Sequence, residues 1–346
     1  MNFASDNHYG ASAKILAAVA AIGQAPAPAY GGDPVTQRVT ARLDEIFARE
    51  VAAYPVINGT TANALSLATL VPPHGAILCH AEAHIAVDEC GAPEFFTHGA
   101  KLVPIEGGDA KLTPDAIERA LKHFQKGFVH HAQPAAISLT QATELGTVYT
   151  PDELKAISAV ARDHRLKLHV DGARFANALV GLGCTAAALS WQSGVDVLSF
   201  GATKNGALAA EAVIFFDPKD AADFEYRRKK SGHLLSKMRF VSAQLEAYLD
   251  GDHWLANARH ANGLAQRLAQ GLARAEDVTV AHPVEANAVF ARMPVALAKR
   301  LRAAGAVFYD WGVPQDGLVL ARLMLSFATP DADVAKLIEA AMSPSP

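Results

Sequence analysis

Cysteine is scarce in this chain, with three residues among 346. Cys79, Cys90 and Cys184 lie far apart and form no CxxC pair. Isolated cysteines at these spacings cannot build the disulfide framework of a small secreted domain. We expect reduced thiols or small core residues, and hence a reducing compartment.

An excess of positive charge is missing as well. The chain has 31 Lys and Arg against 35 Asp and Glu, a formal net charge of −4. Without an overall basic field to hold phosphodiester backbones, nucleic acid is excluded as an expected partner.

Long hydrophobic runs are also absent. The longest early apolar run, residues 15–22, falls far short of the roughly 20 residues of a membrane-spanning helix. The first residues lack the basic-then-apolar order of a signal peptide. We therefore expect a soluble cytoplasmic protein with no membrane partner.

Apolar residues, by contrast, make up 51% of the chain, and charged residues only 19%. A chain of 346 residues exceeds the roughly 250 to 300 residues at which single cores divide, which favours one large and one smaller domain. We predict an arm with a helix at residues 1–32, a large domain at 33–249 and a small α+β domain at 250–346.

Amphipathic helix patterns alternate with short β-rich runs, which is the order of a mostly parallel sheet covered by helices. The fold class predicted is therefore α/β. Strands are expected at residues 135–139, 166–170, 195–200, 212–216, 288–293 and 318–327. Helices are expected at residues 12–24, 62–70, 151–164, 177–191, 221–272 and 295–304.

Two predicted strands lead into residues that can carry chemistry. The strand at 166–170 runs into Asp171, and the strand at 195–200 is followed by Lys204. The carboxyl ends of strands form the ligand-binding edge of an open α/β sheet. Taken alone, Asp171 is a functional carboxylate, a helix N-cap or a metal ligand. Lys204 is either a solvated side chain or a nucleophile in a low-dielectric cleft.

Together the two residues point to one cofactor, pyridoxal phosphate. This cofactor needs a lysine that forms a Schiff base with its aldehyde and an acid that keeps its ring nitrogen protonated. It also needs a phosphate cradle, which Gly59 and Thr60 can supply at the start of a predicted helix. An ordinary capped turn is the alternative reading of that segment.

Four motifs follow one another along the chain. They are Ser5-Asp6-Asn7, Ala83-His84 with Asp88-Glu89 downstream, HVDGAR at 169–174 and SFGATK at 199–204. Their residues and order resemble the threonine aldolase and β-eliminating lyase family, which consists of fold-type I pyridoxal-phosphate enzymes. The resemblance covers nearly the whole chain and implies a large cofactor-binding domain with a smaller C-terminal α+β domain.

The resemblance assigns roles position by position. Lys204 matches the lysine that binds the cofactor covalently, Asp171 the acid that faces the ring nitrogen, and His84 the imidazole that stacks on the ring. Gly59 and Thr60 match the loop that holds the phosphate.

Three arginines and a serine complete the implied site. Arg239 matches an arginine that reaches the phosphate. Ser5, Arg174 and Arg322 match positions that hold the substrate α-carboxylate, and Arg174 also counts among the cofactor-binding residues. A planar guanidinium suits a carboxylate because it can bond both oxygens. For Arg322, pairing across a sheet is the alternative.

Two segments depart from the family pattern. Ahead of Arg239 the family carries a run of glycines, whereas this chain has GHLLS at 232–236. In place of an Asn-Thr-His-Asn run it has QATE at 141–144, so a histidine sometimes assigned to the aldol step is absent. His130 and His131 are candidates to approach the site instead, with a plain solvent-facing loop as the alternative.

No metal site is expected. His80 and His84 are spaced i, i+4, but no glutamate follows the first histidine in HExxH order. The chain also lacks a GxGxxG dinucleotide motif and a Walker phosphate loop.

The expected reaction is cleavage of a β-hydroxy-α-amino acid, of the threonine, allo-threonine or phenylserine type, into glycine and an aldehyde. His84 is the expected base, because an imidazole accepts protons near neutral pH. His130, His131 and a water molecule are the alternatives. A second hypothesis is β-elimination from an amino acid with a β leaving group, and a third is a cofactor-binding sensor. By resemblance, a homodimer or homotetramer is expected.

Overall fold

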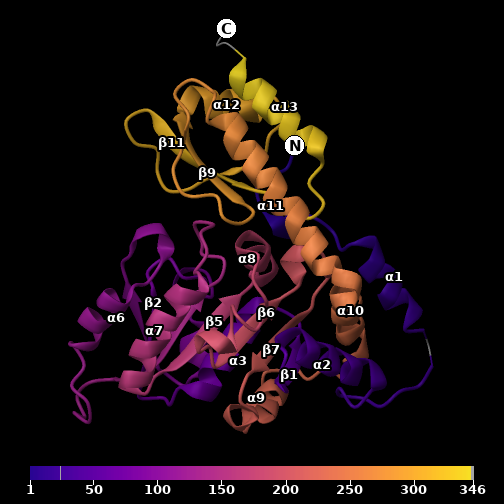
Figure 1. The fold of residues 1–346 in the computed structure, drawn as a ribbon, viewed down its shortest axis with the longest axis vertical. Helices are drawn as coiled ribbons and strands as arrows, with labels where there is room; N and C mark the ends of the chain where they lie inside the picture. The colour runs from indigo at the N-terminus through magenta and orange to yellow at the C-terminus, as the bar shows by residue number, and fades with distance from the viewer. Residues whose placement is uncertain (24, 344–346) are drawn as a thin grey trace.

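A seven-stranded sheet forms the centre of the computed structural model, which describes residues 1–23 and 25–343 (Figure 1). Its strands are β1 (Ala52–Val56), β2 (Gly75–His80), β3 (Lys101–Ile105), β4 (Gln133–Thr140), β5 (Lys167–Gly172), β6 (Val197–Gly201) and β7 (Glu211–Phe215). They lie in the order β1-β7-β6-β5-β4-β2-β3. The strands from β3 to β6 in this order are parallel, whereas β7 pairs antiparallel with β6 and with β1.

Helices cover this sheet, so that β2, β6 and β7 are buried along their whole length. The helices are α2 (Pro34–Phe47), α3 (Gly59–Leu70), α4 (His84–Val87), α5 (Ala92–Phe96), α6 (Pro114–Leu121), α7 (Pro151–His164), α8 (Phe175–Leu182), α9 (Phe224–Lys230) and α10 (Arg239–Leu249). Local sequence sets their ends. In α7, Thr150 and Glu153 form a reciprocal capping box, and Arg165 ends the helix in the left-handed conformation.

A second, antiparallel sheet has the order β10-β11-β9-β8 and a core of its own. Its elements are α11 (His253–Leu272), β8 (Thr279–Val280), β9 (Ala288–Pro294), α12 (Val295–Ala303), β10 (Tyr309–Asp310), β11 (Leu318–Met324) and α13 (Asp331–Met342). The long α11 runs from the large sheet's helices up to this smaller layer (Figure 1). Phe3 packs into the second core, so the first residues of the chain belong beside it.

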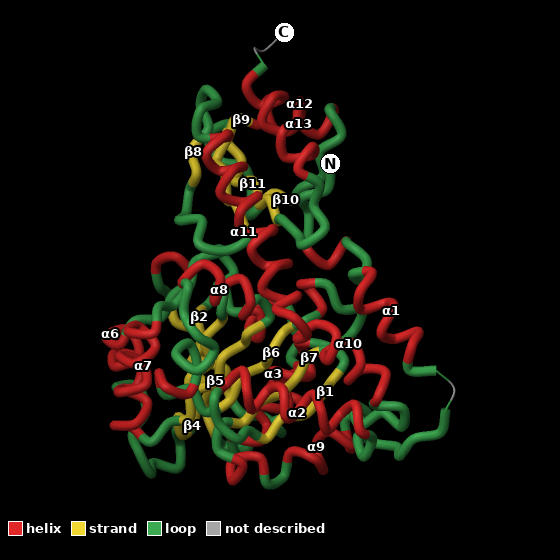
Figure 2. The backbone as a smooth tube through the Cα atoms, turned by 45° about the vertical axis from the view of Figure 1, so that its right-hand side comes forward, coloured by secondary structure: helices red, strands yellow, loops and turns green. Residues whose placement is uncertain are grey.

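The remaining elements are short or peripheral. Helix α1 (Ala13–Ala21) lies beside α10 on the flank away from α6 and α7 (Figure 2). The 3₁₀ helices are η1 (Asp6–His8), η2 (Gly108–Ala110), η3 (Trp191–Ser193), η4 (Thr203–Asn205), η5 (Pro218–Ala221) and η6 (Asp250–Asp252).

The predicted α/β class is confirmed, and each of the six predicted strands coincides with an observed one. Two helix predictions are wrong in extent. The helix expected at 177–191 ends at Leu182, because Gly183 takes the left-handed conformation at φ +62°. The stretch expected at 221–272 is three helices, interrupted at Gly232 (φ +81°) and Gly251 (φ +57°). The predicted end of the first helix, at residue 24, lies outside the described residues.

Other sequence expectations can be compared directly. All three cysteines are free, as expected. Across the two described ranges, no helix combines the length and the apolar character needed to cross a membrane. The domain boundaries at residues 32/33 and 249/250 stay predictions.

Candidate active site

Two adjoining cavities, of about 300 and 180 Å³, open at the carboxyl edge of the large sheet. The first is lined by residues that follow β4, β5 and β6 and by the start of α3. The second extends toward the small sheet and the amino-terminal segment. His84, Arg174 and Lys204 line both cavities, so the two form one continuous site.

Lys204 reaches the first cavity from η4, directly after β6. The turn is held in place by the neighbouring residue, because the Asn205 side-chain amide donates to the Tyr248 hydroxyl and to the Trp254 carbonyl, both at 2.8 Å. Burial and the nearby Arg174 guanidinium lower the pKa of Lys204. A larger fraction of its amine is therefore neutral and nucleophilic than for a solvated lysine.

Asp171 lies one residue before the end of β5 and is buried. Its Oδ1 accepts from the Ala173 amide at 3.0 Å, and its Oδ2 accepts from Asn63 Nδ2 at 2.8 Å. These donors hold a carboxylate at the rim of the first cavity. Asp171 and Lys204, predicted to meet at this edge, do line the same cavity.

His84 begins the short helix α4 and also faces both cavities. Its backbone N–H donates to Glu144 Oε1 at 2.9 Å, and its Nδ1 lies 2.9 Å from Glu89 Oε1. Because a carboxylate can only accept, Nδ1 carries the proton and the lone pair is on Nε2. The hydrogen bond to Glu89 raises the pKa of His84 above its usual range.

The start of α3 supplies the predicted anion cradle. Gly59 and Thr60 line the first cavity, and the Asn58 side chain caps the helix by accepting from the Thr61 amide at 2.8 Å. An added Cβ at Gly59 would meet no atom within 4 Å, so the cradle is open. Amides at a helix N-terminus favour a phosphate at this position.

Arg174 makes a contact that sequence reasoning did not foresee. Its Nε and Nη2 donate to the two carboxylate oxygens of Asp6, at 2.7 and 2.9 Å. Burial opposes ionisation of Asp6, but the guanidinium outweighs it and lowers the pKa of that carboxyl. The pair leaves Nη1 as the arginine's remaining terminal nitrogen. Asn287 Nδ2, from the small domain, also donates to Asp6 at 3.1 Å.

Ser5 and Arg322 line the second cavity. Arg322 comes from β11, donates to the Ala4 carbonyl at 3.2 Å and lies 5.0 Å from the centre of the Trp311 ring. Its Nε is buried without a hydrogen-bond partner among the described residues, and burial lowers its pKa. Arg322 has no carboxylate partner in the described ranges, but its guanidinium lies 5.7 Å from the ring centre of Tyr309, its register partner on the neighbouring strand β10. Pairing across the sheet and binding of the substrate carboxylate therefore both stay predictions for this residue.

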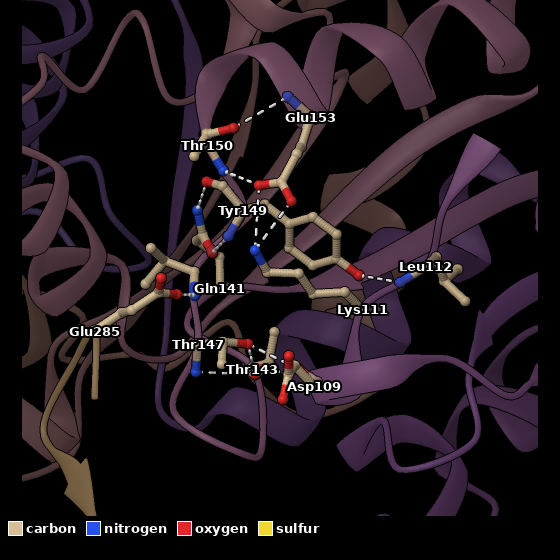
Figure 3. Close-up of polar contacts among 11 residues, drawn as sticks. Asp109, Lys111, Leu112, Gln141, Thr143, Thr147, Tyr149, Thr150, Glu153 and Glu285 are labelled. Atoms are coloured by element: carbon tan, nitrogen blue, oxygen red, sulfur yellow. Dashed lines mark hydrogen bonds and ion pairs between the residues drawn. The ribbon is translucent and has the colours of Figure 1, made fainter. Parts of the chain in front are cut away.

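Glu144 is brought to the site by the loop after β4. Figure 3 shows how this loop is held, with the Gln141 side chain bonded to both backbone groups of Tyr149 and the Tyr149 hydroxyl accepting from the Leu112 amide. Burial raises the pKa of Glu144 to about 7. Glu144 belongs to the QATE run at 141–144, where the sequence departs from the family pattern. That departure was the sequence feature that could have pointed to a further site residue in this segment.

Three predicted residues do not reach the cavities. Arg239 begins α10 with its guanidinium over the Phe240 ring and lines neither cavity. The prediction that His130 and His131 approach the site is wrong within this chain. They precede β4 and therefore lie at its amino end, while the cavities are at its carboxyl end, roughly 25 Å away for an eight-residue strand.

His80 is the other histidine of the pair that is spaced i, i+4 with His84. It contacts the Gly107 carbonyl at 3.0 Å. Within residues 1–23 and 25–343, no group of three or more His, Cys, Asp or Glu side chains could hold a metal ion.

The residues present fit pyridoxal phosphate. A half-buried lysine, a buried carboxylate and an open helix N-terminus line one cavity, and an imidazole stands at its wall. Residues 2–296 match the family described as beta-eliminating lyase, and the chain belongs to this family of pyridoxal-phosphate enzymes.

The most similar relatives compared share one activity in their names. The chain is 44% identical to a low specificity L-threonine aldolase from a Pseudomonas species, over 99% of this chain and 98% of that enzyme. It is also 44% identical to the Pseudomonas aeruginosa enzyme of the same name, over 98% and 95% of the two chains. The threonine aldolase structure from Leishmania major superposes with a TM-score of 0.92 at 27% identity, covering 98% and 97% of the two chains.

Proposed function

We propose that this protein is a low-specificity L-threonine aldolase, an aldehyde-lyase that cleaves β-hydroxy-α-amino acids to glycine and an aldehyde. The near full-length similarity to two Pseudomonas aldolases supports this activity. The observation that carries it is the single cavity lined by Lys204, Asp171 and His84.

The cofactor supplies, when bound, an electron sink beside the substrate's α-carbon. Lys204 provides the amine that binds it covalently. Asp171, held in place by two N–H donors, would be the acid that faces the ring nitrogen. Gly59 and Thr60 receive the phosphate.

His84 removes the substrate's β-hydroxyl proton through Nε2, the nitrogen that does not face Glu89. Loss of this proton and cleavage of the Cα–Cβ bond release the aldehyde. One proton, equivalent to the one taken up by His84, then returns to Cα, which yields glycine and restores the neutral imidazole. Because Nδ1 is held by Glu89, the ring keeps one orientation, and Nε2 is the nitrogen that gains and loses the proton.

Arg322 and Ser5 bind the substrate α-carboxylate from the second cavity, with Arg174 Nη1 as a further donor. Arg322 is the principal anchor in this proposal, because Asp6 already occupies two nitrogens of Arg174. By fixing the carboxylate, Arg322 and Ser5 would orient the substrate so that the Cα–Cβ bond is the one whose electrons the cofactor can accept, which would select this bond for cleavage.

We also propose that the enzyme works in the cytoplasm as a homodimer or homotetramer. Leu208 supports an oligomer, because this apolar side chain is 58% exposed at the wall of the first cavity. In an oligomer, Arg239 would reach the phosphate site of a partner subunit. This role is consistent with its position outside both cavities of its own chain. Light scattering after size exclusion measures the assembly.

An assay of purified enzyme with added pyridoxal phosphate tests the activity. The substrates are L-threonine, L-allo-threonine and phenylserine, and the readouts are glycine and aldehyde. We expect both products in equal amounts. Pyruvate or another keto acid with ammonia, and no glycine, would instead identify an eliminating lyase.

A further inference from the structure

Asn63 lies in the interior of α3, and the site as described so far uses it only as one of the donors to Asp171. Its side chain is fully buried, with 1% exposed. Its Nδ2 donates to Asp171 Oδ2 at 2.8 Å and to Glu89 Oε1 at 2.9 Å. Its Oδ1 is buried and has no hydrogen-bond partner among the described residues. The nitrogen therefore uses both of its hydrogens on two carboxylates.

The chemistry of its partners determines the orientation of this amide. A carboxylate accepts hydrogen bonds and an amide oxygen cannot donate one. Turning the Asn63 amide over would place its oxygen against Asp171 and Glu89 and lose both bonds. The NH₂ group must therefore face the two carboxylates, although this arrangement leaves Oδ1 unpaired.

The bonds form a continuous chain from Asp171 through Asn63 and Glu89 to His84. One end faces the cofactor position and the other carries the proposed base. Asp171 and Glu89 are both within hydrogen-bond distance of one nitrogen atom, so their charges repel at close range. Burial raises the pKa of Glu89, Asp171 adds to the rise, and the bonds from His84 and Asn63 oppose it.

Other charged groups face the same chain. Lys204 lies across the first cavity and acts against protonation of His84, whereas Asp171 and Glu89 favour it. Glu144 contacts the His84 backbone from the loop after β4. None of these groups bonds both carboxylates, so Asn63 alone among the described residues connects the two ends.

We propose that Asn63 is a positioning residue that couples the charge at Asp171 to the proton held between Glu89 and His84. The proposal rests on the function proposed above. A positive charge beside Asp171 reduces its repulsion of Glu89, which then stays ionised and keeps the proton on His84 Nδ1. His84 Nε2 is thereby left with its lone pair toward the substrate. Occupation of the cofactor position thus prepares the base.

The test compares the holoenzyme with Asn63→Leu, which has a similar volume and no donor. Loss of the donor makes both carboxylates more basic, so two pH dependences should move to higher pH. The first is the titration of the bound cofactor's visible absorbance, and the second is the acid limb of kcat/KM for phenylserine cleavage. We expect shifts of about 0.5 to 1 pH unit in each.

Ser66→Ala is the matched control, because Ser66 is equally buried on α3 but its hydroxyl bonds, among the residues that the structure describes, only the Ala62 carbonyl. It should leave both midpoints unchanged. Asn63→Ser, which keeps one donor, serves as the second variant if Asn63→Leu folds poorly, and it should shift both midpoints by a smaller amount.

A double variant separates coupling from packing. If Asn63 acts on His84 through Glu89, Asn63→Leu should not move the acid limb further in a Glu89→Gln background. Lower thermal stability and lower kcat with unmoved midpoints would overturn the proposal and leave Asn63 a packing residue. If wild-type enzyme cleaves no β-hydroxy amino acid, the aldolase proposal fails, and the absorbance titration still decides the role of Asn63.

Discussion

At the scale of single residues, the contacts of His84 separate bond cleavage from the rest of the chemistry. Its Nδ1 is committed to Glu89, so Nε2 is the nitrogen that can accept a proton. His84→Phe keeps an aromatic face for ring stacking and removes that acceptor. We expect retro-aldol cleavage, measured as aldehyde release, to fall about 100- to 10,000-fold.

Exchange of the glycine α-proton with deuterated solvent is the internal control for His84→Phe. This reaction uses the same cofactor but no β-hydroxyl, so NMR should show a much smaller fall. Cofactor content should match the wild type. An equal fall in both reactions would mean that His84 acts on the cofactor alone, and that a water molecule or Glu144 is the base.

Arg322 offers a similar comparison for substrate binding. Loss of this charge-assisted contact should cost about 2 to 4 kcal/mol of transition-state stabilisation, or roughly 30- to 1,000-fold in kcat/KM. Steady-state kinetics of Arg322→Ala measures the loss, with cofactor content unchanged. Arg292→Ala is the control, because Arg292 lies on the adjacent strand β9 and is exposed. Normal kinetics in Arg322→Ala would assign the carboxylate to other donors.

Residue identities at strand ends were predictable, whereas contacts between elements were not. Asp171 and Lys204 follow β-like runs, and parallel strands bring their carboxyl ends to one edge. Asn63 lies inside an apolar helix, and nothing local marks which strand that helix covers. The Asp6–Arg174 pair joins residues 168 positions apart, so only the folded chain reveals it.

At the scale of elements, the sheet contains a buried polar contact across three strands. His169 on β5 bonds the Ser138 hydroxyl on β4 at 2.8 Å and the Ser199 hydroxyl on β6 at 3.0 Å. Burial lowers the pKa of His169 to about 4, so this imidazole is neutral in the folded protein at neutral pH.

This burial predicts a loss of stability in acid. Below about pH 6.5 the unfolded chain binds a proton at His169, whereas the folded chain does not bind it until the pH reaches about 4. The contribution of His169 to the free energy of unfolding therefore falls as the pH drops through this window, by at most about 1.4 kcal/mol per pH unit. Urea unfolding at pH 7.5 and 5.0 measures it.

Other buried acids make a variant necessary for this test. Burial also raises the pKa of Glu144 and of Glu211 to about 7. The contribution of these two groups to the free energy of unfolding therefore increases as the pH falls. His169→Gln keeps a donor and an acceptor for the two serines but does not titrate. Between pH 7.5 and pH 5.0 the free energy of unfolding of the wild type should fall relative to that of the variant, because only the wild type has the His169 contribution to lose. Parallel losses would contradict the assignment.

Element directions also explain the error over His130 and His131. Both were candidates because the QATE run at 141–144 lacks the histidine of the family pattern, and they were expected to approach the site from the loop before the strand, with a solvent-facing loop as the alternative. A strand separates its two ends by about 3.3 Å per residue, so residues before it belong to the opposite edge of a parallel sheet. The helix at 177–191 failed for a local reason, since Gly183 was a stop signal inside an apolar pattern.

At the scale of the whole molecule, the site is assembled from three parts of the chain. The large sheet supplies Lys204 and Asp171, the small sheet supplies Arg322, and the amino-terminal segment supplies Ser5 and Asp6. Asp6 bonds residues of both larger parts, so it ties the segment between them. The composition predicted two domains but could not place the first residues beside the second core.

The covalent attachment of the cofactor at Lys204 tests this assembly most directly. Holoenzyme is treated with borohydride, digested, and searched by mass spectrometry for the peptide that carries the reduced cofactor. We expect the label on Lys204 alone and its loss in Lys204→Ala, with the variant otherwise folded by circular dichroism. A label on another lysine, or a label retained in Lys204→Ala, would contradict it.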